Sequence, residues 1–246
     1  MRIFIIGSID KKASAFPQFS KVCREIGLSL SEKTIDVLLC SPFDGSADKE
    51  LILGFSSSRN QQANIELHYP QHENVESNWN ELLGSAIDHN CIRIRKFRHP
   101  SPEKVTQEGW KNAWLFCQIQ ALNNASIIFT IGGNIDGSSN LLLRIAEAQG
   151  KPIIPLSSFG GAASSFLDRN KYELIDQLGN DQFKIIEQGT KFEQIAAIVT
   201  GFTNLKKLEH LKKYQQDPIF FISYPRDRPS EADYIEMLCE EEIISF

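Results

Sequence analysis

The sequence lacks the patterns that mark disulfide-rich, zinc-binding and membrane proteins. Its cysteines are odd in number, at positions 23, 40, 91, 117 and 239. None forms a CxxC pair and most lie in apolar stretches, which favours buried free thiols. The five histidines show no HExxH or other paired spacing, so no metal site is predicted. No stretch approaches the roughly 20 apolar residues of a membrane span, and no signal peptide is evident, so we expect a cytoplasmic protein without a membrane partner.

An excess of positive charge is also absent. The formal net charge of the 246 residues is -5, which gives no global attraction to nucleic-acid backbones or anionic lipids. We therefore expect no stable nucleic-acid partner, and any anionic ligand has to be held by a local site. Hydrophobic residues make up 41% of the chain and charged residues 23%, so disorder is excluded and a packed core is expected.

Short apolar runs alternate with helical patterns along the first two thirds of the chain. The apolar runs cover residues 3–7, 35–40, 65–67, 91–97, 127–131 and 152–156. Helical spacing of apolar residues is found at 16–26, 47–55, 76–88, 107–122 and 139–149. This alternation predicts an α/β fold, in which a doubly wound, mainly parallel sheet is covered by helices on both faces.

The last third of the chain predicts a change of organisation. A glycine turn at 159–163 leads into a predicted helix at 164–178, and a second helix at 192–214 ends in a polar linker. A new apolar strand then begins at 219–224 and is followed by a helical pattern at 229–240. We expect a ligand-binding domain at 1–180, a helical connector at 181–216 and the beginning of another domain at 217–246.

The predicted strand at 127–131 runs into the loop Gly132-Gly133-Asn134-Ile135-Asp136-Gly137-Ser138 and then into a helix. Glycines at the end of a strand let backbone N–H groups approach a ligand, and a helix start offers unpaired donors and a positive dipole end. We expect this loop to hold a phosphate group. The alternative is a tight turn between strand and helix without a ligand.

Three other loops follow strands and are expected at the same edge of the sheet, since the carboxyl ends of parallel strands meet there. They contain Gly7 and Ser8, then Ser41, Phe43, Asp44 and Ser46, and finally Phe159, Gly160 and Gly161. Basic residues of the strand at 91–97 are further candidates for binding phosphate, above all Lys96 and Arg98 near its carboxyl end. The alternative for this strand is a charged edge that faces solvent.

Residues 1 to about 170 resemble the SLOG superfamily, the relatives of the LOG and DprA proteins. The resemblance rests on the segments at 4–8, 40–48 and 131–138, together with 142–147 and 151–155. It implies a Rossmann-like sheet that binds nucleotides or nucleotide-derived signals, with no cofactor in this chain. LOG enzymes, which cleave cytokinin ribotides, carry a PGGxGTxxE motif. Here Ile131 replaces the proline, and Asn140 and Leu141 stand where the acidic residue is expected, so no catalytic residue is assigned.

The segment at 218–228 resembles the first strand of TIR domains, and the chain ends before the helix that supplies their catalytic glutamate. The resemblance implies a sensor for a cyclic ADP-ribose-type signal or a cyclic oligonucleotide. This sensor would control an attached TIR effector with NAD as its substrate, in prokaryotic antiviral defence and as a homo-oligomer. One alternative is a nucleotide N-glycosidase or deoxyribosyltransferase, which requires a suitably placed carboxylate at Asp44, Asp48, Asp136 or Glu147. Another is an oligomerisation scaffold with a vestigial pocket.

Overall fold

The computed structural model describes residues 1–58, 60–86, 92–102, 106–189 and 191–201. One compact unit takes in Met1–Lys206. The predicted TIR-like segment at 217–246, and the part of the predicted helix 192–214 that follows residue 201, lie outside the described residues. Of the helices in the described ranges, none is long and apolar enough to cross a membrane.

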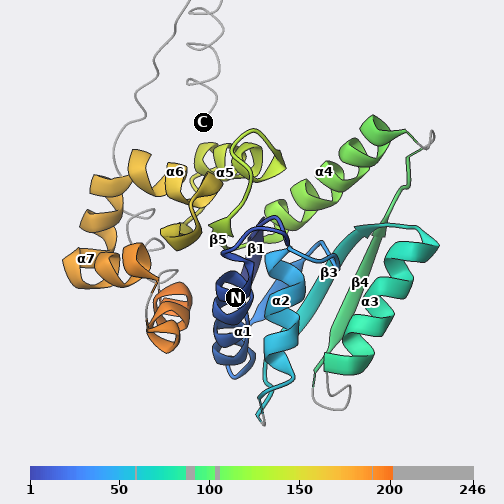
Figure 1. The fold of residues 1–246 in the computed structure, drawn as a ribbon, viewed down its shortest axis with the longest axis horizontal. Coiled ribbons are helices and arrows are strands. Elements are labelled where there is room, and N and C mark those ends of the chain that lie inside the picture. The colour runs from blue at the N-terminus through green and yellow to red at the C-terminus, as the bar shows by residue number, and fades with distance from the viewer. Residues whose placement is uncertain (59, 87–91, 103–105, 190, 202–246) are drawn as a thin grey trace, which may run out of the picture. The chain divides into compact units, whose positions relative to one another are not determined.

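A six-stranded sheet forms the centre of this unit, and every pair of neighbouring strands in it is parallel. The strands are β1 (Arg2–Ser8), β2 (Asp36–Leu39), β3 (Asn64–Pro70), β4 (Ile94–His99), β5 (Ile127–Gly132) and β6 (Ile153–Leu156). Their order in the sheet is β4-β3-β2-β1-β5-β6 (Figure 1). The predicted doubly wound α/β fold of Rossmann type is confirmed.

Helices cover both faces of the sheet because the order of the strands reverses direction at β1. The connections from β1 through β2 and β3 to β4 move toward one edge of the sheet, and the connections to β5 and β6 move toward the other edge. Because such crossovers are right-handed, the two sets of helices lie on opposite faces. One face carries α1 (Phe16–Ser31), α2 (Ala47–Phe55) and α3 (Glu73–Ala86), and the other carries α4 (Gln107–Asn124) and α5 (Ser138–Ala148) (Figure 1). The chain continues through α6 (Gly161–Arg169) and α7 (Lys171–Gln188).

The position of each strand in the sheet explains its composition. Every residue of the inner strand β5 is buried, as expected for a strand covered on both faces. The outer strand β4 is mostly half-buried or exposed, and it carries the basic residues that the sequence places there. Cys23, Cys40 and Cys117 are buried free thiols, as predicted, whereas Cys91 and Cys239 lie outside the described residues.

The predicted single helix at 164–178 is wrong. The chain forms two helices there, α6 and α7, and Asn170 lies between them with non-helical backbone angles (φ -108°, ψ 18°). A further break inside α7 occurs at Gly179 (φ 77°, ψ 159°). Apolar spacing alone did not reveal these breaks, because Phe166, Leu167, Leu174 and Leu178 all face the same core. Residues 192–201 are helical and bury Ile195 and Val199.

Candidate functional site

The carboxyl ends of β1 and β5 lie side by side where the strand order reverses. Gly7 pairs with Ile131 and Ser8 with Gly132 in the register of these two strands. After β1 the chain turns toward α1 on one face, and after β5 it turns toward α5 on the other. The two loops therefore separate, and a crevice opens between them, at the place where doubly wound sheets bind ligands.

A cavity of about 170 Å³ lies at this point. Its walls come from the ends of β1 and β2, the starts of α2 and α5, and one side chain of α4. The lining residues are Phe4, Ile5, Ile6, Gly7, Ser8, Cys40, Ser41, Ser46, Asp48, Gln118, Ser138, Ser139 and Leu142. The cavity is smaller than the roughly 300 Å³ at which pockets for whole small molecules begin, so it has room for part of a nucleotide.

The amino end of α5 forms one wall of the cavity. Asn134 shapes the loop before it, since its Oδ1 accepts the N–H of Asp136 at 3.0 Å and its carbonyl accepts the N–H of Gly137 at 3.3 Å. Gly137 is the N-cap residue, and no described side chain caps the helix. The first N–H groups of a helix have no acceptor within the helix. Unpaired donors and the positive dipole end therefore border the cavity at Ser138 and Ser139.

The loop between β2 and α2 forms the opposite wall. Ser46 caps α2, accepting the Lys49 N–H at 3.2 Å, and its hydroxyl lies 2.7 Å from the Phe43 carbonyl oxygen. A bridge between Ser8 and Ser46 joins this loop to the end of β1. The structure thus brings together five of the residues that the sequence proposed: Gly7, Ser8, Ser41, Ser46 and Ser138.

Asp48 is the one carboxyl group among the residues that line the cavity. Its Oδ2 accepts the backbone N–H groups of Cys40 and Ser41, both at 2.7 Å, and the residue is 5% exposed. Burial raises the pKa of Asp48 to about 7, although the hydrogen bonds from Ser41 and Cys40 oppose this. Within the described ranges, no basic side chain forms an ion pair with it.

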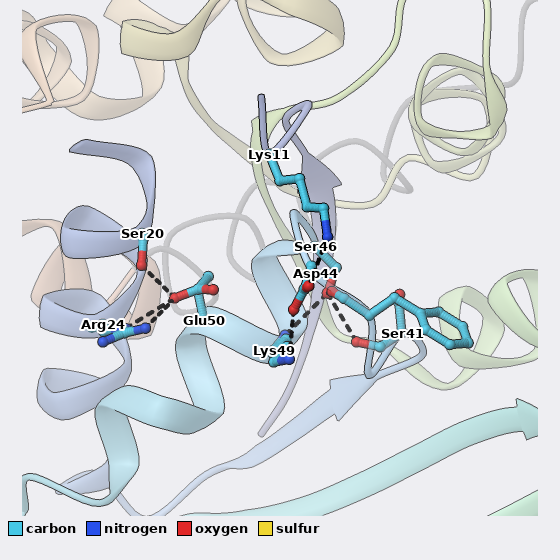
Figure 2. Close-up of polar contacts among 9 residues, drawn as sticks. Lys11, Ser20, Arg24, Ser41, Asp44, Ser46, Lys49 and Glu50 are labelled. Atoms are coloured by element: carbon cyan, nitrogen blue, oxygen red, sulfur yellow. Dashed lines mark hydrogen bonds and ion pairs between the residues drawn. The ribbon is translucent and has the colours of Figure 1, made fainter. Parts of the chain in front are cut away.

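Phe43 and Asp44, from the same loop, lie outside the cavity. Figure 2 shows Asp44 between two lysines, with its carboxylate 3.2 Å from Lys11 Nζ and 2.7 Å from Lys49 Nζ. The hydrogen bond from Lys49 is the largest of the effects that lower the pKa of Asp44. Phe43 is exposed and packs edge-on against Trp114, with ring centroids 5.8 Å apart.

The basic candidates Lys96 and Arg98 lie on β4, which β3 and β2 separate from β1. Lys96 Nζ donates to Asn80 Oδ1 at 2.7 Å, and Arg98 Nε donates to Glu76 Oε1 at 2.7 Å. Neither residue lines the cavity. The structure therefore does not bring them together with the glycine loops.

The loop before α6 packs against the glycine loop after β5. The carbonyl of Gly133 accepts the N–H of Ala162 at 3.0 Å, so the backbones at Gly133 and Gly161 come very close. Phe159 packs edge-on against Phe19, with centroids 5.3 Å apart. Gly132, Gly133, Gly160 and Gly161 therefore belong to two loops that pack together, and none of them lines the cavity. Asn134 and Asp136 are exposed and do not line it either.

Sequence reasoning missed Gln118 and Leu142 as lining residues, whereas it did include Ser139 in the predicted phosphate-binding loop. The Oε1 atom of Gln118 is buried and, among the described residues, has no hydrogen-bond partner. No sequence pattern indicates Gln118, because α4 reaches the cavity from a distant part of the chain. Leu142 lies one turn into α5, and the apolar spacing of that helix indicated only that Leu142 is buried.

No protein-family model matches the chain, and no curated protein matches it. Three solved structures are similar in fold. The protein TM1055 is 18% identical to this chain, and the match covers 68% of this chain and 80% of TM1055, with a TM-score of 0.45. DNA processing protein A from Streptococcus pneumoniae is 10% identical, and the match covers 68% of this chain and 56% of the S. pneumoniae protein, with a TM-score of 0.47.

The third is DNA processing protein A from Helicobacter pylori, 11% identical over 74% of this chain and 81% of its own, with a TM-score of 0.46. That protein is described as binding single-stranded DNA. The expectation that excluded a nucleic-acid partner is corrected accordingly, since net charge cannot exclude a partner held by a local surface. At this identity the likenesses concern the fold alone, a Rossmann-like α/β domain.

Proposed function

We propose that this chain binds a nucleotide, with a phosphate group of the ligand at the amino end of α5. The observation that supports this most directly is the cavity between β1 and β5, where Ser8, Ser138 and Ser139 meet an uncapped helix start. Helix amino ends in such a position bind phosphate through backbone N–H groups and the helix dipole.

Neutral donors, and not basic side chains, are expected to hold the phosphate. No lysine or arginine is among the described residues that line the cavity. Backbone N–H groups, serine hydroxyls and the Gln118 amide supply the polar groups instead. Because the cavity holds only part of a nucleotide, the sugar and base would extend past the exposed residues Asn134 and Asp136.

Replacing Ser138 tests the proposed phosphate position. In Ser138→Asp, a carboxylate at the first turn suits the helix dipole and stabilises α5 by about 0.3–1 kcal/mol, but it repels a phosphate. We expect AMP binding, measured by calorimetry, to weaken at least tenfold while the melting temperature is retained. Ser138→Asn is the matched neutral control and should bind within a few-fold of wild type. Equal AMP affinity in all three proteins would refute the proposed position.

The finer proposal is that the bound ligand is a nucleotide-derived signal, of the cyclic ADP-ribose or cyclic oligonucleotide type, and that it controls a TIR-like part. Residues 217–246 lie outside the described residues, so this regulation rests on the sequence resemblance. A calorimetric screen of linear and cyclic nucleotides against the full chain tests the ligand class. Preference for a linear monophosphate over every cyclic compound would contradict it.

A second candidate function is hydrolysis of a nucleotide N-glycosidic bond, which Asp48 favours. Of the four carboxylates that this activity could use, Asp48 lines the cavity, whereas Asp44 and Asp136 are exposed and Glu147 lies 3.6 Å from Arg169. A protonated carboxyl can donate its proton to the departing base while water adds to the sugar. Chromatography of AMP after incubation with the protein would reveal free adenine, and Asp48→Asn should abolish its release.

A further inference from the structure

A carboxyl group and the proposed phosphate position share the same small cavity. Asp48 lies in the wall opposite Ser138 and Ser139, and only 5% of the residue is exposed. Like charges at short range in a poorly hydrated site repel each other strongly. The ligand phosphate and an ionised Asp48 are therefore not compatible without compensation.

Among the described residues, no positively charged side chain forms an ion pair with Asp48 that could offer such compensation. The nearby ionisable groups are the thiols of Cys23 on α1, Cys40 at the end of β2 and Cys117 on α4, and the carboxyl of Glu50 on α2. Burial raises the pKa of each of these thiols, so they stay neutral near pH 7. Glu50 is bound by Ser20 and by Arg24, whose Nη2 lies 2.9 Å away (Figure 2). Lys49 and Lys11 are both engaged by Asp44.

We infer that Asp48 takes up a proton when an anionic group enters the cavity, so that the protein binds the anion and one proton together. The inference rests on the proposed nucleotide binding. A protonated Asp48 can still accept the N–H groups of Cys40 and Ser41, and it gains an O–H group that can donate to a phosphate oxygen. Asp48 would therefore change from a repulsive neighbour to a ligand contact, which selects anionic ligands at neutral and lower pH.

The coupling has a definite sign. In the free protein Asp48 is largely ionised above pH 7, because its pKa is about 7. An anion raises that pKa further, so binding at pH 8 has to take up close to one proton. Affinity then falls up to about tenfold for each unit of pH above 7, until the pKa of the complex is reached. The AMP phosphate has its own second pKa near 6 and stays dianionic over this range.

Calorimetry on the full wild-type chain tests the inference without any variant. AMP and sulfate, which does not titrate here, are each titrated into the protein at pH 7, 8 and 9. At pH 8 the experiment is repeated in Tris and in HEPES, whose ionisation heats differ. We expect weaker binding at each higher pH, and a difference in heat between the two buffers that corresponds to the uptake of close to one proton.

The isosteric variant Asp48→Asn identifies the group that takes up the proton. It should bind AMP with an affinity that no longer changes from pH 7 to 9, and at least tenfold more tightly than wild type at pH 9. Asp181→Asn, at an exposed position of α7, should behave as wild type. Binding by wild type without pH dependence or proton uptake, or a pH dependence retained in Asp48→Asn, would overturn the inference while leaving nucleotide binding intact. Absence of AMP and sulfate binding at every pH would overturn the proposed function as well.

Discussion

Two aspartates of one loop show how strongly local surroundings determine the chemistry of a residue. Asp44 and Asp48 are four positions apart and flank the same helix start. Asp44 is exposed between two lysines, and its pKa is lowered, whereas the buried Asp48 has a raised pKa. Their residue type and spacing do not distinguish them. The two residues differ because Asp48 lines the cavity, whereas Asp44 does not.

At the same scale, we predict that Asp48→Asn stabilises the folded protein at alkaline pH. The pKa of Asp48 is 3.8 when unfolded and about 7 when folded, so the native state binds more protons between these values. The contribution of Asp48 to the free energy of unfolding is therefore fully present below pH 4 and is lost as pH rises to about 7. The loss is at most about 4 kcal/mol. The variant, which has no charge to bury, should gain this amount at pH 8 and nothing at pH 4 in urea unfolding.

Asp44→Asn provides the opposite control. The pKa of Asp44 is lowered in the folded protein, so the stability that Asp44 contributes is present above its unfolded pKa and is lost as pH falls. We expect Asp44→Asn to be slightly less stable than wild type at pH 8. A gain in stability for both variants at pH 8 would show that burial of Asp48 is not the cause.

The start of α6 shows how one element is held against another. Gly161 has a positive φ of 66°, and a Cβ there would lie 2.0 Å from the carbonyl oxygen of Gly133. That carbonyl accepts the N–H of Ala162, so the two glycine loops are joined at backbone level. Gly160, the residue before it, also has a positive φ, of 65°, but a Cβ there meets no atom within 4 Å.

The pair Gly161→Ala and Gly160→Ala separates close packing from backbone strain. Strain alone costs about 1–3 kcal/mol, and we expect Gly160→Ala to lose that much stability. Gly161→Ala has to displace the Gly133 backbone in addition, so we expect a loss at least about 2 kcal/mol larger and weaker AMP binding. Denaturant unfolding and calorimetry measure both effects. Equal losses in the two variants would show that the contact between the loops is not required.

At the scale of the whole molecule, the proposed nucleotide site and its supporting core belong to one unit, Met1–Lys206. Residues 192–201 contribute to that core although they follow the last strand by more than thirty positions. Their side chains at Ile195, Ala196 and Val199 are fully buried. The fold thus depends on chain beyond the predicted boundary at residue 180.

Two truncations test this dependence. A chain that ends at Lys206 keeps every residue of the cavity and of the described core, so we expect wild-type AMP affinity and an unchanged melting temperature. A chain that ends at Gln188 loses the buried Ile195 and Val199, each worth about 1.5–3 kcal/mol, and should be less stable by at least about 3 kcal/mol. Loss of AMP binding by the chain that ends at Lys206 would contradict this assignment of the site.

The sequence by itself was sufficient for the order and type of the elements from β1 to β6, but not for the division of the following helical region into α6 and α7. Because strands buried on both faces are continuous apolar runs and helices show a period of 3.6, β1 and α2 could be placed almost to the residue. The loops with Gly7, Ser41 and Gly132 could be assigned to one edge of the sheet, because the carboxyl ends of parallel strands all lie there. The start of α5 was visible as Gly137 followed by two serines, but only the structure shows that no described side chain caps it.

Only the tertiary structure decided which polar groups meet. Lys96 and Arg98 were plausible phosphate ligands until the strand order placed β4 at the far edge of the sheet. Gln118 reaches the cavity because the crossover from β4 to β5 carries α4 back over the sheet, a path that no local pattern encodes. Periodicity reports which face of an element is buried, but strand order and crossover direction, which depend on contacts between distant residues, determine what that face touches.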